Sequence, residues 1–373
     1  MMKSLGFGVM RLPLVDGSDA KSVDYDKAYE MIKAFMDGGF SYFDTGYMYH
    51  DHYSENVLRD LLVKRFPRDS FQIADKMPVF TIKNAAAVPL VFDEQLRRLG
   101  IEYFDYYLLH SVSREFYEPM CEGFGCFEFI SKKKREGKIR EIGFSYHDDA
   151  ELLDRILTEH PEMDFVQLQI NYLDWEDSKI QSRKNYEVAR RHGKKIAIME
   201  PVKGGTLVNV PEEVERLLKS HAPDRSIASW ALRFAASLEG VFMTLSGMGN
   251  MDQVLDNMAT MGNFVPLSAE EREIIEKSTE IIKGAVAVPC TSCGYCVEGG
   301  CPARVDIPRY FEIYNAEKTC RDSHEVAVNK YKKLGESSGT PSDCIGCGKC
   351  ERACPQHLKV REHLSKVAEY YKG

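Results

Sequence analysis

Short runs of β-branched and aromatic residues alternate with amphipathic segments along the first two thirds of the chain. These runs predict eight strands, which are Gly6–Leu12, Tyr42–Thr45, Phe71–Lys76, Phe104–His110, Glu141–Ser145, Phe165–Ile170, Lys195–Glu200 and Val241–Ser246. The clearest predicted helices between them are Tyr25–Met36, Val88–Leu99, Phe127–Lys134, Ala150–Leu157 and Ile227–Phe234. Because neighbouring parallel strands need a crossover helix, the alternation predicts an α/β fold, a (β/α)₈ barrel of the TIM type.

A doubly wound open sheet is the alternative arrangement of such elements. The absence of a Gly-x-Gly-x-x-Gly turn after the first strand weakens it. A last helix is predicted over Ser268–Lys283, where Ser268 and Glu271 form a capping box and Gly284 is expected to end the helix. We therefore expect a barrel domain in residues 1–285 and a second domain in residues 286–373.

The composition is that of a globular protein, since 44% of the 373 residues are hydrophobic and the formal net charge is −8. No apolar run approaches the roughly 20 residues that cross a bilayer, and the N-terminal stretch lacks a secretory core. We therefore expect a soluble, cytoplasmic protein without membrane contact. The acidic balance argues against nucleic acid as a partner, because phosphate binding needs clustered Lys and Arg.

Nine of the eleven cysteines lie between Cys290 and Cys354. They include two copies of one pattern, Cys290-x₂-Cys293-x₂-Cys296-x₄-Cys301-Pro302 and Cys344-x₂-Cys347-x₂-Cys350-x₃-Cys354-Pro355. In a cytoplasmic protein such density predicts metal ligands and not disulfides. The second copy has the spacing of bacterial ferredoxins, and the first copy departs from it by one extra residue within Val297–Gly300.

Three thiolates at this spacing can bind three irons of a cubane cluster, while the fourth, before proline, ligates the other cluster. This pattern predicts two [4Fe-4S] sites, with the ligand sets Cys290, Cys293, Cys296, Cys354 and Cys344, Cys347, Cys350, Cys301. Zinc is the alternative, but zinc knuckles do not use a third cysteine at this spacing. The tail is thus expected to be a small α-rich ferredoxin-like domain, with Cys121, Cys126 and Cys320 outside the ligand sets.

Four ionisable residues stand at or just beyond the ends of neighbouring predicted strands. Asp44 ends the second strand, Tyr49 follows it in the loop, Lys76 ends the third strand and His110 ends the fourth. In a barrel the C-terminal ends of the strands converge on one mouth. The sequence therefore predicts a catalytic cluster there; the alternative is a structural Asp44–Lys76 ion pair beside a loop tyrosine.

With these motifs the chain resembles the aldo-keto reductase family over about residues 5–265, and more narrowly its members with a ferredoxin-type tail. The resemblance implies that Asp44, Tyr49, Lys76 and His110 act as a catalytic tetrad. Tyr49 would give a proton to a substrate carbonyl. A tyrosine with a pKa near 10 needs a nearby cation for this, and Lys76, held by Asp44, supplies one. His110 would orient the carbonyl oxygen.

The same resemblance implies a nicotinamide dinucleotide, NADP or NAD, across the barrel mouth. Glycines in its pyrophosphate loop would let backbone amides approach the phosphates. The implied contact residues are Ser145, Gln169, Glu200, Pro201, Lys203, Gly204, Gly205, Ser246, Gly247, Met248, Asn250, Gln253 and Asn257. Gly247 and Gln253 stand where a basic pair would bind a 2′-phosphate, so the choice between NADP and NAD stays open.

The leading hypothesis is an oxidoreductase that reduces a small carbonyl compound by hydride transfer and carries an iron–sulfur tail. The tail either serves a redox protein partner or uses its clusters only to hold its own fold together. A hydride carries two electrons and a [4Fe-4S] cluster takes one, and the chain has no flavin signature to convert between them. The alternative is therefore an electron-transfer or redox-sensing protein that uses the barrel as a nicotinamide-binding module. A barrel acting only as a scaffold is a third hypothesis.

Overall fold

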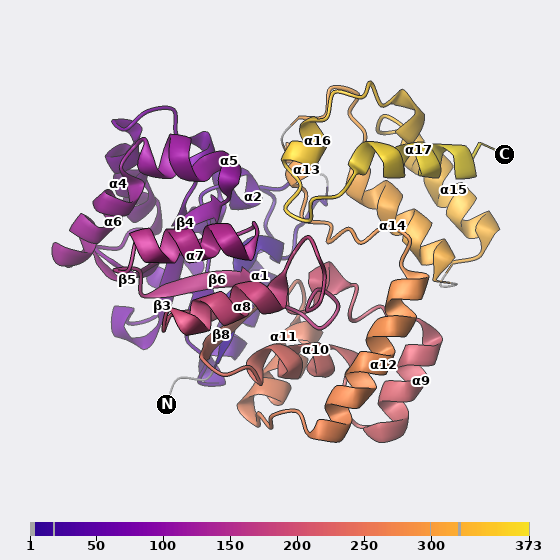
Figure 1. Cartoon of the computed structure of the whole chain (residues 1–373), viewed down its shortest axis with the longest axis horizontal. Helices are drawn as coiled ribbons and strands as arrows, with labels where there is room; N and C mark the ends of the chain where they lie inside the picture. The colour runs from indigo at the N-terminus through magenta and orange to yellow at the C-terminus, as the bar shows by residue number, and fades with distance from the viewer. Residues whose placement is uncertain (1–3, 18, 299, 320–321, 373) are drawn as a thin grey trace. The chain divides into compact units, whose positions relative to one another are not determined.

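The structure is a computed structural model, and it describes residues 4–17, 19–298, 300–319 and 322–372. Eight parallel strands close into a barrel in the order of the sequence (Figure 1). They are β1 (Leu5–Gly8), β2 (Tyr42–Asp44), β3 (Gln72–Met77), β4 (Phe104–Val112), β5 (Ile139–Tyr146), β6 (Phe165–Gln169), β7 (Lys195–Met199) and β8 (Val241–Gly247). The predicted barrel is confirmed; only the first strand is clearly shorter than expected, because Val9–Arg11 forms a 3₁₀ turn.

Helices follow the strands along the chain. Those before the tail are α1 (Tyr25–Asp37), α2 (Tyr49–His52), α3 (Ser54–Leu58), α4 (Ala87–Leu99), α5 (Arg114–Phe116), α6 (Cys126–Arg135), α7 (Ala150–Glu159), α8 (Ser182–Arg191), α9 (Glu212–His221), α10 (Ile227–Ala236), α11 (Met251–Gly262) and α12 (Ala269–Ala285). The capping box of Ser268 and Glu271 is present at the start of α12. The expectation that Gly284 ends this helix is wrong, because the helix runs on to Ala285.

Short helices carry the rest of the chain. They are α13 (Tyr295–Glu298), α14 (Ile307–Lys318), α15 (His324–Gly335), α16 (Lys349–Arg352) and α17 (Val360–Tyr370). Their apolar faces form a separate small core, in which Tyr310 and Phe311 of α14 are fully buried. Val305, Ala327, Leu364 and Val367 complete this core. The α-rich tail expected from the sequence is confirmed within the described residues, and Cys320 lies outside them.

The chain forms two compact units, and each unit combines segments that are separated in the sequence. The first unit comprises residues up to Pro201 together with Ser229–Leu267, and it holds all eight strands. The second unit comprises Val202–Ala228 and the chain from Ser268 onward, so α9 and α12 belong to it along with the tail helices. A domain boundary near residue 285 stays a prediction.

Aromatic side chains fill the bottom of the barrel, at the N-terminal ends of the strands. Tyr42 and Tyr106 pack with ring centroids 5.0 Å apart, and Phe242 stacks on Tyr106 at 5.4 Å. Phe165 packs edge-on against both Tyr106 and Phe242. These large buried rings stabilise the closed barrel and leave only the C-terminal ends of the strands for polar side chains.

No helix among the described residues is long and apolar enough to cross a membrane.

Candidate functional site

The alternation of side chains along the strands sets the position of the polar cluster. Successive side chains of a strand point to opposite faces, so a residue two positions after an inward one also points inward. Tyr42, Ala74 and Leu108 belong to the barrel interior, and two residues later stand Asp44, Lys76 and His110. By the same rule, Gln167 points into the barrel like Phe165 two residues before it, and it is 2% exposed. The predicted acid, lysine and histidine therefore converge inside the barrel mouth.

Lys76 is the centre of this cluster. Its ammonium donates a hydrogen bond to Asp44 Oδ1 at 2.6 Å and another to the carbonyl oxygen of Thr45. Both Lys76 and Asp44 are buried, at 1% and 4% exposure. Burial raises the pKa of Asp44, while the ammonium of Lys76 and the amide of Gln167, at 3.3 Å from Oδ2, act in the opposite direction. A buried charge pair of this kind needs each partner to compensate the other.

Tyr49 lies on the loop after β2 and contacts two members of the cluster. The ammonium of Lys76 is 5.0 Å from the centroid of the Tyr49 ring, and the ring of His110 meets it edge-on at 6.0 Å. The chain turns sharply after Tyr49, because His50 and Asp51 have positive φ angles of 53° and 48°. All four residues of the predicted tetrad are thus brought together.

His50 anchors the turn that presents Tyr49. Its Nε2 lies 2.9 Å from the carbonyl oxygen of Val9, and its Nδ1 lies 3.0 Å from that of Ala20. With 8% exposure the ring is buried, so both ring nitrogens are engaged by backbone. This side chain holds the loop in place.

His110 sits in an environment that favours the neutral imidazole. Burial, then the charge of Lys76, then that of His147 lower the pKa of His110 well below its usual value. Its Nδ1 has no hydrogen-bond partner among the described residues. The ring of Phe80 packs edge-on against it at 5.5 Å. A neutral imidazole can still donate one hydrogen bond, which is what an orienting group for a carbonyl oxygen needs.

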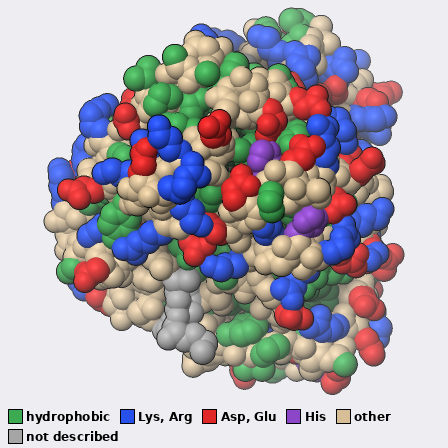
Figure 2. Space-filling model, turned by 60° about the vertical axis from the view of Figure 1, so that its left-hand side comes forward, with side chains coloured by type: hydrophobic (Ala, Val, Ile, Leu, Met, Phe, Trp, Pro, Cys, Tyr) green, Lys and Arg blue, Asp and Glu red, His purple; other side chains and the backbone are tan. Residues whose placement is uncertain are grey.

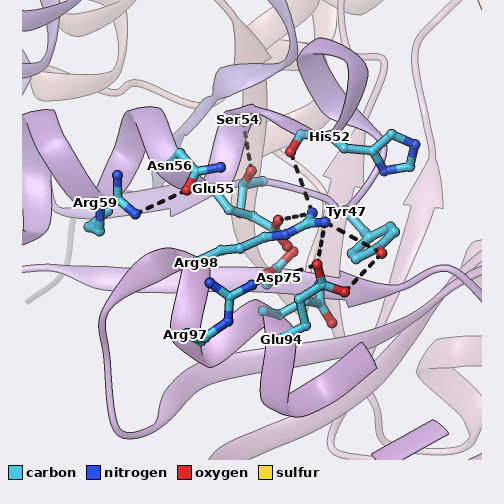
Figure 3. Close-up of polar contacts among 12 residues, drawn as sticks. Tyr47, His52, Ser54, Glu55, Asn56, Arg59, Asp75, Glu94, Arg97 and Arg98 are labelled. Atoms are coloured by element: carbon cyan, nitrogen blue, oxygen red, sulfur yellow. Dashed lines mark hydrogen bonds and ion pairs between the residues drawn. The ribbon is translucent and has the colours of Figure 1, made fainter. Parts of the chain in front are cut away.

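A second polar network joins Tyr47, Glu55 and Arg98 (Figure 3). Arg98 of α4 donates to Glu55 Oε2 at 2.8 Å and to Glu94 Oε1 at 2.6 Å, and its guanidinium stacks over the Tyr47 ring at 4.5 Å. Glu55 is fully buried beside Asp75, which directly precedes Lys76. Burial, then the charge of Glu55, raises the pKa of Asp75 well above its usual value.

The predicted dinucleotide residues of the first unit hold one another in ordered turns. Ser145 accepts a hydrogen bond from the Ser111 amide at 2.8 Å, and Gln169 donates to Asp174 at 2.8 Å. Two further contacts order the turn between β8 and α11. Asn257 donates to Ser246 Oγ at 2.9 Å, and the Gly249 amide donates to Gln253 Oε1 at 2.8 Å. Asn250 caps α11, and Met248 beside it is fully buried. Their role in dinucleotide binding stays a prediction.

The glycine loop after β7 belongs to the second unit and has unusual backbone angles. Lys203, Gly204 and Gly205 have φ angles of 47°, 60° and 99°, and Glu200 before them has 58°. Lys203 is only 2% exposed, and its ammonium donates to Gln356 Oε1 at 3.2 Å. Binding of the dinucleotide pyrophosphate by this loop also stays a prediction.

The eight predicted ligand cysteines surround two cavities in the second unit. Cys290, Cys293, Cys296 and Cys354 line the first, together with Thr291 and Gln356. Cys301, Cys344, Cys347 and Cys350 line the second, together with Ile345 and Arg361. Each cavity thus takes three thiols from one repeat and one from the other, which is the grouping predicted from the spacing.

The thiols of each cavity have the grouping that a [4Fe-4S] cluster uses, three from one cysteine repeat and one from the other. Burial, then the neighbouring Cys293, Cys290 and Cys354, raises the pKa of Cys296. Burial also raises the pKa of Cys350, to about 11. When bound, a cluster would hold the four sulfurs of each cavity as thiolates, and its iron would compensate their charge.

The sequence reasoning missed three side chains that contact the cluster in the barrel. Gln167 could have been found from its alternation with Gln169 on β6, because both have the inward phase. Phe80 lies in a 3₁₀ turn, Val79–Thr81, that no sequence pattern marked. His147 follows β5 directly and is close enough to influence the pKa of His110.

The surface carries both signs of charge. On the face shown in Figure 2, Lys and Arg side chains are interspersed with Asp and Glu side chains. This agrees with the formal net charge of −8.

Comparisons with known proteins were consistent with this geometry. The model of the aldo/keto reductase family matches residues 4–280, and that of a 4Fe-4S dicluster domain matches residues 289–359. A curated relative, the NADH-specific methylglyoxal reductase of Escherichia coli K12, is 26% identical over 187 residues. That match covers 45% of this chain and 54% of the relative, so it spans about half of the relative's length. Both resemblances inferred from the motifs are confirmed.

Solved structures share the barrel. The holo form of an aldo-keto reductase from Bacillus halodurans matches with a TM-score of 0.59 and 24% identity, covering 74% of this chain and 91% of that one. An aldo-keto reductase from Klebsiella pneumoniae in complex with NADPH matches with a TM-score of 0.57 and 20% identity, covering 74% and 90%. At these identities the likeness shows the fold alone.

Proposed function

The chain belongs to the aldo/keto reductase family and carries a C-terminal 4Fe-4S dicluster domain, and from this premise we propose that it reduces a small carbonyl compound with Tyr49 as proton donor. The observation that carries the proposal is the contact of Tyr49 with both Lys76 and His110 inside the barrel. A nicotinamide dinucleotide bound there supplies the hydride. The relatives bind NADPH or are specific for NADH, so both are candidates.

Each member of the tetrad has a distinct task in this proposal. The alkoxide that forms on hydride arrival takes the phenolic proton of Tyr49. The ammonium of Lys76, fixed by Asp44, stabilises the negative charge left on the phenol oxygen. His110 in its neutral form donates a hydrogen bond to the carbonyl oxygen and orients it. Phe80 and Phe116, whose rings are 6.1 Å apart, provide an apolar wall next to His110.

The test is Tyr49→Phe in anaerobically purified protein with both clusters loaded. Oxidation of NADH and NADPH is followed with methylglyoxal and a panel of aldehydes and ketones. We expect kcat to fall by about 10²- to 10⁴-fold, the usual contribution of a positioned proton donor. Tyr53→Phe is the matched control on the same segment, since its hydroxyl pairs with Tyr25 at 3.4 Å. Carbonyl reduction that survives Tyr49→Phe unchanged would contradict the proposal.

We propose further that the tail exchanges single electrons with a redox protein partner. The ligand sets are those of the two cavities, Cys290, Cys293, Cys296 with Cys354 and Cys344, Cys347, Cys350 with Cys301. The observation that favours exchange is the exposure of the second cavity, where Cys347 is exposed and Ile345 is 68% exposed. A bound cluster there would supply one-electron chemistry near solvent, within reach of a partner.

A rapid-mixing experiment separates carbonyl reduction from nicotinamide-driven electron transfer. NADH or NADPH is added to the oxidised protein under anaerobic conditions and the visible absorbance of the clusters is followed. We expect the clusters to stay oxidised, because a two-electron hydride has no converter on this chain. Bleaching of the clusters coupled to nicotinamide oxidation would instead favour a redox-sensing protein with a nicotinamide-binding barrel.

A further inference from the structure

A buried lysine lies beside the first thiol cavity. Lys203 is 2% exposed, and its ammonium donates to the side chain of Gln356 at 3.2 Å. Gln356 follows two residues after Cys354 and lines the same cavity as the four thiols. The positive charge is therefore one side chain removed from the predicted cluster, in a region where little water screens it.

The backbone of the same loop touches the other side of this cavity. A Cβ on Gly204 would lie 2.1 Å from the carbonyl oxygen of Thr291. The two backbones are therefore too close together for any residue but glycine at position 204. Thr291 stands between Cys290 and Cys293 and is 1% exposed. Lys203 and Gly204 thus contact both segments that contribute thiols to the first cavity, which fixes the distance between the ammonium and the site.

The second cavity has a cation of a different kind. Lys349 and Arg361 both line it, but Lys349 is exposed, the Arg361 guanidinium pairs with Glu351 at 2.7 Å, and the Arg361 side chain is 49% exposed. Solvent and the carboxylate both screen its charge. The two cavities therefore differ in the burial of the neighbouring cation, although their thiol ligands are arranged alike.

We propose that Lys203 raises the reduction potential of the first cluster above that of the second. Reduction adds one electron, and hence one negative charge, to a cluster without making or breaking a bond, and a buried cation stabilises that charge. The electron comes from a low-potential reductant such as dithionite. This inference rests on the proposed ligand set of the first cavity.

The difference gives the tail a direction. With this difference, an electron given to a second cluster at exposed Cys347 would pass to the first cluster, next to Lys203. The first cluster would then hold the electron, and the second would face solvent and a partner.

The test is a redox titration with dithionite and mediators, followed by electron paramagnetic resonance. The variants are Lys203→Gln and Lys203→Met, which remove the charge, and Lys203→Arg, which keeps it. The wave of the first cluster is the one lost in Cys290→Ala. In the neutral variants we expect this wave to move to lower potential by about 59 mV or more, a tenfold change in the reduction equilibrium. Arg361→Gln is the matched control at the second cavity and is expected to move its wave less.

Iron and sulfide content is measured first, because it tests the proposed ligand set separately from the effect of Lys203 on the reduction potential. If Cys290→Ala leaves both clusters in place, the proposed ligand set of the first cavity is wrong. The inference then fails for that reason, and not because of the effect assigned to Lys203. With the ligand set intact, an unshifted first wave in both neutral variants overturns the inference, and so does an equal shift in Lys203→Arg. Loss of the first cluster from both neutral variants also overturns it, because Lys203 would then serve assembly and not potential.

Discussion

The barrel site and the thiol cavities compensate their polar groups in opposite ways. In the barrel, protein atoms satisfy one another: Lys76 is held by Asp44 and Thr45, and Asp44 also by Gln167. In the tail, eight thiols surround two cavities, burial raises the pKa of Cys296, and the single ammonium of Lys203 beside the first cavity is too little charge to compensate four thiolates. The barrel site is thus formed by contacts among protein atoms, whereas we expect the tail to depend on its clusters.

Removal of iron is expected to have the largest effect, and to affect the tail but not the barrel. Chelation of oxidised protein should abolish the ordered packing of the tail around Tyr310 and Phe311, because the tail then loses the metal that joins its two cysteine repeats. The barrel should keep its structure. Limited proteolysis and hydrogen exchange check this, with fast exchange expected in α14 and α17 and slow exchange in β3 and β4. Equal protection of the tail with and without iron would contradict it.

Lys76→Met tests the barrel half of the comparison. It leaves the Asp44 carboxylate buried without its cation, so we expect a loss of about 3–5 kcal/mol in the free energy of unfolding together with loss of activity. Denaturant unfolding monitored by circular dichroism measures the first. Lys64→Met is the matched control, because the Lys64–Asp60 pair at 2.8 Å is exposed on the lysine side and should contribute below about 1 kcal/mol. Similar losses of unfolding free energy in both variants would mean that burial of an ion pair does not determine its contribution to stability.

Gly204→Ala probes the close approach in the second unit. The residue has φ +60°, and the new methyl group would meet the Thr291 carbonyl, so we expect a cost of about 1–3 kcal/mol and faster loss of the first cluster. Gly137→Ala controls for the backbone angle alone, since it has φ +74° and nothing within 4 Å of a Cβ. Cluster loss under air, followed by visible absorbance, gives the readout. A first cluster that is retained equally well in both variants would argue against the close approach.

Asp75→Asn should give the smallest effect, a change in pH dependence. Because burial and Glu55 raise the pKa of Asp75, the folded chain keeps a proton that the unfolded chain releases above its ordinary pKa of 3.8. The free energy of unfolding therefore falls as pH rises toward the folded pKa, by at most about 1.4 kcal/mol per pH unit for one proton. Asp75→Asn should flatten this slope, and Asp93→Asn on the exposed face of α4 should not. Urea unfolding across pH 4–8 decides.

The barrel and its polar cluster could be predicted because strand alternation and chain order are local properties. Asp44, Lys76 and His110 each end a strand, and parallel strands bring such ends together whatever the loops do. The cysteine groups followed from spacing alone. Burial of His50 could not be foreseen, because its partners Val9 and Ala20 are distant in sequence. For the same reason nothing linked Lys203 to Gln356, which lies far along the chain.

The crossed grouping of the thiols has a consequence for biosynthesis. Each cavity needs cysteines from both repeats, so neither can close while the chain is still emerging from the ribosome short of Cys344 and Cys354. The barrel strands, all earlier in the sequence, can pair before that. If the cavities take clusters as proposed, iron delivery is a step after translation, and a scaffold protein donating clusters would meet a folded barrel with an open tail.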